Sequence, residues 1–400
     1  MITLDADSRL AVGHLIVRQE NEDEYVVGDP ATGTFVVVPE LGARLVELFA
    51  AGRTVAEAAM ALEQETGEPI DALDFAEVLV EAGIINDQAE AARAKVWSVS
   101  RIPAWVVRPL FGKVAWTFYA GCLLTTLWMF VAEPSLRPTY EDTFVFPDIA
   151  ASLLLTNVVV VLLTILHEIW HAFAGAAVGV PSQLRLERRG VFPVLETDLS
   201  GLWALPPAKR YGPFLAGMGI DSVILFAAVA PRYAWSHGWI ELPPGLIRIL
   251  AMVVLSQVAK LAFQTLAYLR TDMYLVMATA TGCNNLHQVT RLSLKRLVRN
   301  LRPDEAVILR DANPRDLRVA RWYRLLYLAG LIWMVFFALQ FVLPSAKVAL
   351  GWSLGILFGA PIASFYWWEG LLLISFTLLD VTLPLFVVVR NRIRARRAVA

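Results

Sequence analysis

Residues 164–175 read TILHEIWHAFAG and lie within residues 150–178, one of the most apolar stretches of this 400-residue chain. A helical stretch of that length can cross a bilayer, because about twenty apolar residues are enough. Two histidines and a glutamate are costly in such a helix, and polar side chains at membrane depth mark function by default. The stretch therefore predicts a membrane protein with a functional site inside it.

The composition of the whole chain also indicates a membrane protein. Hydrophobic residues make up 57% of it and charged residues 18%, whereas about a quarter of the residues of a soluble protein are charged. We expect a polytopic α-helical protein with about six transmembrane helices. The candidate spans are residues 113–132, 150–178, 213–231, 245–269, 322–343 and 364–389. For the glycine-rich stretch 347–361, the sequence leaves open whether it spans, re-enters or belongs to the last helix.

The connections between these spans predict their orientation. Residues 179–212, residues 270–321 and the end of the chain are rich in lysine and arginine, whereas residues 133–149 and 232–244 are not. Since cytoplasmic connections carry the excess of basic residues, six spans place the N and C termini in the cytoplasm. We expect an integral protein of a bacterial inner or plasma membrane, in contact with membrane lipid.

Residues 1–90 differ in charge from the rest and predict a separate domain. They carry a formal charge of −15, and the remainder carries +14. Strand-like runs within residues 10–38 come first. Three amphipathic helical patterns follow, at residues 40–50, 54–66 and 71–85. We expect a small cytoplasmic α+β domain of winged-helix character (βββααα), too acidic to bind nucleic acid. A basic juxtamembrane linker, residues 91–112, would connect it to a membrane domain, residues 113–400.

His167, Glu168 and His171 form the HExxH pattern. Side chains four residues apart lie on one face of a helix, so both imidazoles can bind one metal ion, with Glu168 beside it as the general base. Zn²⁺ supplies a water molecule of lowered pKa and polarises a carbonyl group, which is the chemistry that amide hydrolysis needs. The pattern therefore predicts a zinc site, and a structural His/Glu pair on a helix is the alternative interpretation.

A catalytic zinc ion usually has three protein ligands and one open position. No third histidine or acid follows closely on the same helix, so the remaining ligand must come from elsewhere. Asp272 follows the fourth candidate span, at the depth expected for the two histidines. Asp221, inside the third span, is the alternative ligand, or else a group that supports a ligand from behind. Asn284 and Asn285, like His287, could bond the substrate or orient Asp272.

Three motifs within residues 150–290 resemble those of the site-2 protease family of intramembrane zinc metalloproteases, in its peptide zinc metalloprotease branch. HEIWHAFAGAAVGV (167–180) is similar to the metal-binding helix of that family. RTDMY (270–274) with GCNNL (282–286) resembles the motif that holds its third ligand, with Met273 in place of the usual glycine. FLAGMGID (214–221) resembles Ala-Gly-Pro-x-x-Asn. The resemblance implies that His167, His171 and Asp272 hold zinc.

The N-terminal domain resembles the PqqD-like fold, the recognition element of enzymes that modify ribosomally made peptides (a RiPP recognition element). The residues that carry this likeness are LVELFAAGRTVAEAAMALEQETG (45–67) and DFAEVLVEAGII (74–85). The resemblance implies that an extended leader peptide adds as a strand to the sheet edge, between residues 33–38 and 72–84. A generic winged-helix domain used for dimerisation is the alternative.

Other polar residues also lie at membrane depth: Gln257, Lys260, Glu369 and Asp380. They either line a water path to the zinc ion or pair between helices.

These features together predict a zinc metalloendopeptidase. The two resemblances imply that it hydrolyses a peptide bond in a ribosomally made peptide or a membrane-anchored segment, recognised by the N-terminal domain. A peptide export or immunity protein with a structural or inactive zinc site is the alternative function. A metal-responsive signalling protein whose acidic domain binds a partner is a third.

Overall fold

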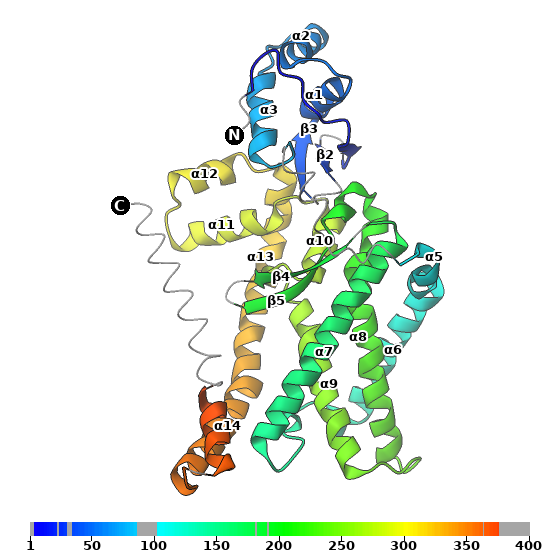
Figure 1. The fold of residues 1–400 in the computed structure, drawn as a ribbon, viewed down its shortest axis with the longest axis vertical. Helices are drawn as coiled ribbons and strands as arrows, with labels where there is room; N and C mark the ends of the chain where they lie inside the picture. Colours follow the sequence, from blue (N-terminus) through cyan, green and yellow to red (C-terminus); the bar gives the residue numbers. More distant parts are fainter. Residues whose placement is uncertain are drawn as a thin grey trace.

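The structure, a computed structural model, covers most of the chain in two connected units. It describes residues 4–21, 24–29, 34–85, 102–180, 182–189, 192–362 and 364–375, with the backbone alone over 183–195. A small mixed unit at the N-terminal end is followed by a larger helical unit (Figure 1). The second half of the candidate span 364–389, which includes Asp380, and the first half of the expected linker, residues 91–101, lie outside the described residues.

The N-terminal unit has the predicted βββααα order. Strands β1 (Ile16–Gln19), β2 (Glu24–Asp29) and β3 (Thr34–Pro39) form an antiparallel sheet in sequence order. Helices α1 (Glu40–Ala50), α2 (Val55–Thr66) and α3 (Ala72–Glu81) cover it.

Helix packing and capping explain why this short unit folds. Phe49, Leu62 and Leu79, one from each helix, are fully buried in a single core. The start of α2 is defined locally, because Thr54 and Glu57 form a reciprocal capping box.

Four long helices form a bundle in the second unit. They are α6 (Lys113–Ala132), α7 (Ile149–Ala177), α8 (Pro207–Ser236) and α9 (Pro244–Gln264). Helix α8 packs against the other three. The described part of the expected linker contains two short helices, α5 (Ala104–Val107) and η2 (Arg108–Phe111).

Within the part of the chain that the structure describes, five helical segments are long and apolar enough to cross a membrane. Four are α6 to α9, and the fifth is the continuous stretch Pro314–Gly359. That stretch consists of α13 (Pro314–Phe337), the π-helical turn η7 (Ala338–Val342) and α14 (Leu343–Gly359). The chain turns at the lower end of α13 (Figure 1), where η7 and Pro344 interrupt the regular hydrogen-bond ladder. Residues 347–359 therefore belong to the helix that follows the fifth expected span.

Two connections differ from the expectation. We expected residues 179–212 only as a basic connection, but they contain the hairpin β4 (Gln183–Arg189) and β5 (Phe192–Asp198), then η5 (Ser200–Ala204). The fourth expected span, residues 245–269, ends early at Gln264, and a tight turn leads to α10 (Asp272–Thr281). In that turn Arg270 adopts a left-handed backbone conformation, with φ of 57°.

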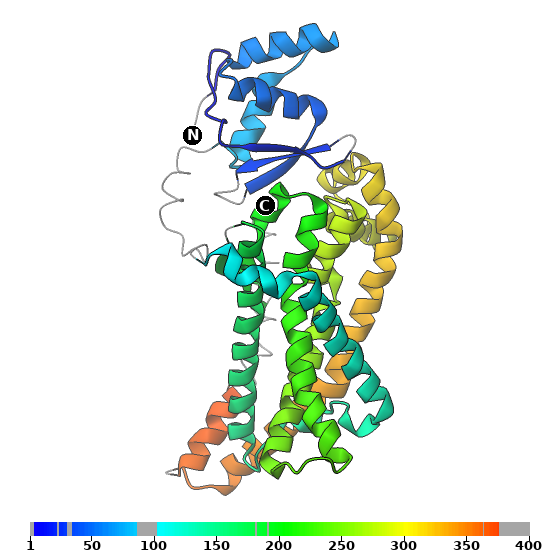
Figure 2. The same ribbon diagram turned by 90° about the vertical axis from the view of Figure 1, so that its right-hand side faces the viewer.

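The two units meet at the end of the bundle that carries the hairpin. Helices α11 (Leu286–Val298) and α12 (Pro303–Arg310) lie at this end (Figure 1). The N-terminal sheet contacts η5, and Figure 2 shows it above the ends of α7 and α8. This arrangement places the acidic unit close to the end of α7 that contains HExxH.

Candidate metal centre

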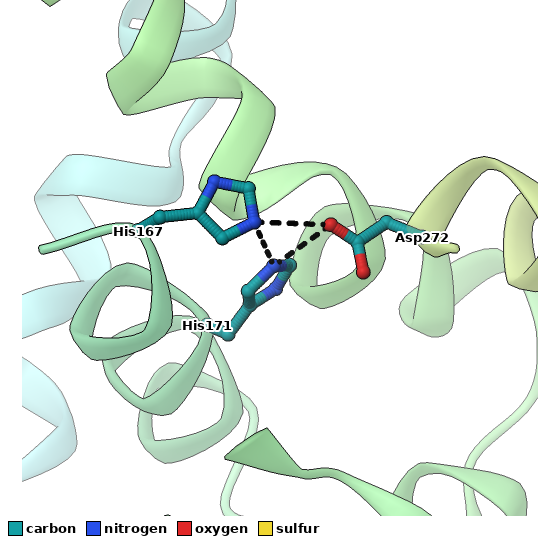
Figure 3. Close-up of side chains that lie close together, drawn as sticks. All are labelled: His167, His171 and Asp272. Carbon is teal, nitrogen blue, oxygen red and sulfur yellow. Dashed lines mark hydrogen bonds and ion pairs between the residues drawn. The ribbon is translucent and has the colours of Figure 1, made fainter. Parts of the chain in front are cut away.

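Three side chains meet where α7 faces the start of α10 (Figure 3). Nε2 of His167 lies 3.1 Å from Nε2 of His171. Oδ2 of Asp272 lies 3.2 Å from the His167 nitrogen and 3.1 Å from the His171 nitrogen. Both histidines are almost fully buried, and the three residues could together hold one metal ion. The structure thus brings together the three residues that the sequence singled out as ligands.

These separations suit zinc. With bonds of about 2.0–2.2 Å, ligand atoms at the corners of a tetrahedron stand roughly 3.3–3.5 Å apart. The three observed distances, 3.1–3.2 Å, are slightly shorter, so a small side-chain movement would admit the ion. Two imidazoles and one carboxylate are a common donor set of catalytic zinc sites, which keep a fourth position open.

Asp221 lies behind His167 and not among the ligand atoms. Its Oδ2 is 2.7 Å from Nδ1 of His167, the ring nitrogen on the side away from Asp272. Its Oδ1 accepts a hydrogen bond from Gln257 at 3.2 Å and lies 2.7 Å from Nζ of Lys260. Asp221 therefore orients the imidazole and leaves Nε2 to face the metal position. Lys260 and Gln257 of α9 thus both pair with Asp221 of α8.

The backbone of α8 also supports the two histidines. Nδ1 of His171 donates to the carbonyl oxygen of Pro213 at 2.8 Å. Gly217 packs against the His167 ring. A Cβ at this position would stand 2.3 Å from Cε1 of His167. Only glycine leaves room for the imidazole at this helix crossing. The sequence offered a signal for it, since Gly217 lies in the FLAGMGID motif.

Glu168 is tied to the hairpin that the sequence did not predict. The backbone N–H of Thr197, near the end of β5, donates to Oε2 of Glu168 at 2.7 Å. The Thr197 hydroxyl donates to the backbone oxygen of Glu168 at 2.9 Å. The first hydrogen bond fixes the Glu168 carboxylate, and the second ties the backbone of α7 to β5.

A cavity of about 170 Å³ opens at this point. Its walls include Glu168, His171 and Asp272 from the site, together with Gln264 and Trp203. A catalytic zinc site needs space of this kind at its open position. The arrangement therefore places the Glu168 carboxylate and two of the three candidate ligands, His171 and Asp272, at one chamber.

The Asp272 carboxyl is ionised beside the two imidazoles. Burial raises the pKa of this carboxyl, but the charge of His171 and the hydrogen bonds with His167 and His171 outweigh it. Its pKa therefore lies well below its usual range, and a deprotonated carboxylate is the form that binds metal.

Asn284 and Asn285 lie away from the triad. The Asn284 amide donates to Oε2 of Glu24 at 2.8 Å, and the backbone N–H of Asn285 donates to Asp316 at 3.0 Å. Helix α10 separates them from Asp272, because its ten residues rise by about 15 Å. Neither residue therefore orients Asp272 in this structure, and Asn284 instead joins the two units of the chain.

Gln264 is a site residue that the sequence analysis missed. It is the last residue of α9, and its Nε2 lies 3.2 Å from Nε2 of His167. A polar residue at the end of an apolar span, eight positions before Asp272, was the available signal. Only the turn between α9 and α10 brings it back to the triad.

No known protein family, curated protein or solved structure matches this chain. Function must therefore be argued from the geometry of the site. The resemblances to site-2 proteases and to PqqD-like domains rest on the quoted motifs alone.

Proposed function

We propose that this chain is an intramembrane zinc metalloendopeptidase that receives its peptide substrate from the N-terminal unit. The observation that carries the proposal is the convergence of His167, His171 and Asp272, with Glu168 on the same helix and a cavity beside them. Structural zinc sites are normally closed by four protein ligands. Within the described residues the ligand group has three members, which favours a catalytic site.

The chain's own residues account for the acid–base chemistry. Bound Zn²⁺ would lower the pKa of a water molecule and polarise a peptide carbonyl. Glu168 accepts a proton from the attacking water as the new C–O bond forms, and delivers it to the amide nitrogen as the C–N bond breaks. The Thr197 N–H keeps the Glu168 carboxylate in place during both transfers.

The hydropathy of the helices supports a membrane location for this chemistry. Five segments can cross a membrane by length and composition, and we propose residues 364–389 as the sixth span. With both termini in the cytoplasm, the C-terminal part of α7 and its HExxH pattern lie near the cytoplasmic surface. The N-terminal unit packs at the same end of the bundle (Figure 2).

Direct contact between the N-terminal unit and the cavity wall supports substrate delivery. Arg18 of β1 donates to the backbone oxygen of Trp203 at 3.0 Å, and Trp203 lines the cavity. A peptide held by the N-terminal unit would start close to the proposed site. The class of substrate rests on the two resemblances: a ribosomally made peptide on the RiPP recognition element, and a membrane-anchored segment on the site-2 protease family.

The test uses the detergent-purified full-length chain in three forms: wild type, Asp272→Ala and Glu168→Gln. Wild type should hold about one zinc ion per chain, Asp272→Ala should lose it, and Glu168→Gln should keep it. Wild type should also cleave members of a quenched fluorescent peptide library, and Glu168→Gln should not. A zinc-loaded wild type without cleavage, or a Glu168→Gln variant with normal biological function, would favour the export or immunity alternative.

A further inference from the structure

The orientation of the Gln264 side chain is set by the start of α10. The backbone N–H of Asp272 donates to Oε1 of Gln264 at 3.2 Å. Only the oxygen of a side-chain amide accepts hydrogen bonds, so the NH₂ group must be at the other position. That NH₂ group faces the ligands, with its nitrogen 3.2 Å from Nε2 of His167.

A second contact holds the same turn. The Thr271 hydroxyl donates to the backbone oxygen of Gln264 at 2.7 Å. Gln264 and Asp272 are thus bonded to each other across the short segment that links α9 to α10. The amide is therefore pre-organised beside the proposed metal position.

The chemistry of the ligands decides what this amide can do. With a metal ion bound, Nδ1 of His167 would keep the proton that it shares with Asp221, and Nε2 would bind the ion through its lone pair. The Gln264 N–H could then no longer donate to this nitrogen. Amide nitrogen is not a zinc ligand, since zinc takes thiolate, imidazole and carboxylate. The NH₂ group is then a free donor that lines the same cavity as Glu168.

We propose that the Gln264 side-chain amide donates a hydrogen bond to the carbonyl oxygen of the peptide bond being cleaved. This inference rests on the proposed function and adds a catalytic residue to it. As water adds to the carbonyl carbon, the π electrons of the C=O bond move onto the carbonyl oxygen. The attacking water gives its proton to Glu168. A fixed N–H aimed at the oxygen stabilises the developing negative charge.

The expected effect is large in turnover and small in metal binding. Loss of one such donor typically lowers kcat by about 10²–10³-fold. Gln264→Met removes the donor at similar volume, and should keep one zinc ion per chain with a nearly unchanged KM. Thr265→Val is the matched control, because this exposed neighbour bonds only the local carbonyl of Ala262, and it should retain wild-type turnover.

A probe that needs no substrate gives a second readout. Acetohydroxamate presents a carbonyl oxygen to a metal ion, and its binding to the Co²⁺-loaded protein can be followed in the visible spectrum. Gln264→Met should bind acetohydroxamate about tenfold more weakly, as expected for one lost hydrogen bond. Gln264→Glu covers the case in which the Met variant fails to fold. It keeps an acceptor for the Asp272 N–H and should also lose turnover.

Three outcomes would overturn the inference. Normal turnover and normal acetohydroxamate binding in Gln264→Met, or normal turnover in Gln264→Glu, would show that the donor is not used. Loss of zinc from Gln264→Met would show that the residue only positions Asp272. Glu168→Gln, measured in parallel, separates the two proposals. If it is inactive while Gln264→Met is fully active, only the Gln264 inference fails, whereas an inactive zinc-loaded wild type removes the proposed function itself.

Discussion

Asp221 and Asp272 lie on opposite sides of the His167 ring, Asp221 at Nδ1 and Asp272 at Nε2. The two carboxylates that the sequence left as rival ligands therefore have different tasks. Asp272 shares the proposed metal position with His171, and Asp221 fixes the direction of His167. This division gives each aspartate its own mutational signature.

Asp221→Asn should weaken zinc binding without abolishing it. Outer-shell partners of ligating histidines contribute about 10–100-fold in metal affinity, whereas Asp272→Ala removes a ligand. Competition with a chromophoric chelator measures both affinities. Equal losses in the two variants, or a greater loss in Asp221→Asn, would contradict the assignment.

Gly217→Ala should damage the site through sterics alone. The new methyl group would stand 2.3 Å from Cε1 of His167, so the ring or helix α8 must move. Overpacking of this kind typically costs about 1–3 kcal/mol, and the displaced imidazole should bind zinc poorly. Zinc content and Tm are the measurements. Gly212→Ala on the same helix is the control, because its nearest neighbour is Trp116 at 4.0 Å; equal effects of both variants would refute the steric explanation.

Lys260→Met should be more harmful than the double variant Lys260→Met/Asp221→Asn. Nζ of Lys260 lies 2.7 Å from the fully buried Asp221 carboxylate and also donates to the backbone oxygen of Leu163. Removing one partner of a buried ion pair leaves an uncompensated charge, typically at a cost of about 3–5 kcal/mol. The double variant removes both charges and should recover much of the lost stability. Thermal unfolding of wild type, the two single variants and the double variant measures the stability of each. If the losses of the single variants add up in the double variant, the two residues do not interact.

Glu20→Gln should loosen the contact between the N-terminal unit and the bundle. Arg210 is fully buried and binds both oxygens of Glu20, at 2.6 Å and 2.5 Å, while its guanidinium stacks 4.8 Å from the Trp203 ring. The variant should make the contact surfaces of the two units, around Arg18 and Trp203, more accessible to limited proteolysis. Glu65→Gln is the control, since Glu65 forms only an exposed pair with Arg44, and it should leave the digestion pattern unchanged.

The same ion pair predicts a pH dependence. Burial raises the pKa of Glu20, but hydrogen bonds and charges from Arg210 and Arg18 outweigh it and bring the pKa below its ordinary 4.5. A depressed native pKa stabilises the docked state above about pH 4.5, and that stabilisation is lost as the pH falls through the native value. Proteolysis between the units, followed with an acid-active protease, should therefore rise below about pH 4.5 in wild type. Glu20→Gln should show no such dependence.

Local patterns were enough to predict the HExxH site and the order of the N-terminal unit. Residues four apart on a helix share a face whatever the rest of the fold does, so the pairing of His167 with His171 needed no tertiary information. The capping box of Thr54 and Glu57 is equally local. Hydropathy is a sum over neighbouring residues, which is why the four bundle helices appear close to their expected positions.

The sequence by itself determined the chemistry available to this protein: two imidazoles and a general base in one apolar helix. Only the tertiary structure decided which other side chains reach them. Asp221 and Asp272 lie at compatible depths, and their separate tasks depend on how α8 crosses α7 and how the chain turns after α9. Gln264, Thr197 and the Glu20–Arg210 contact likewise depend on approaches between segments distant in sequence. Such approaches are set by the packing of whole helices, and single-residue patterns do not record them.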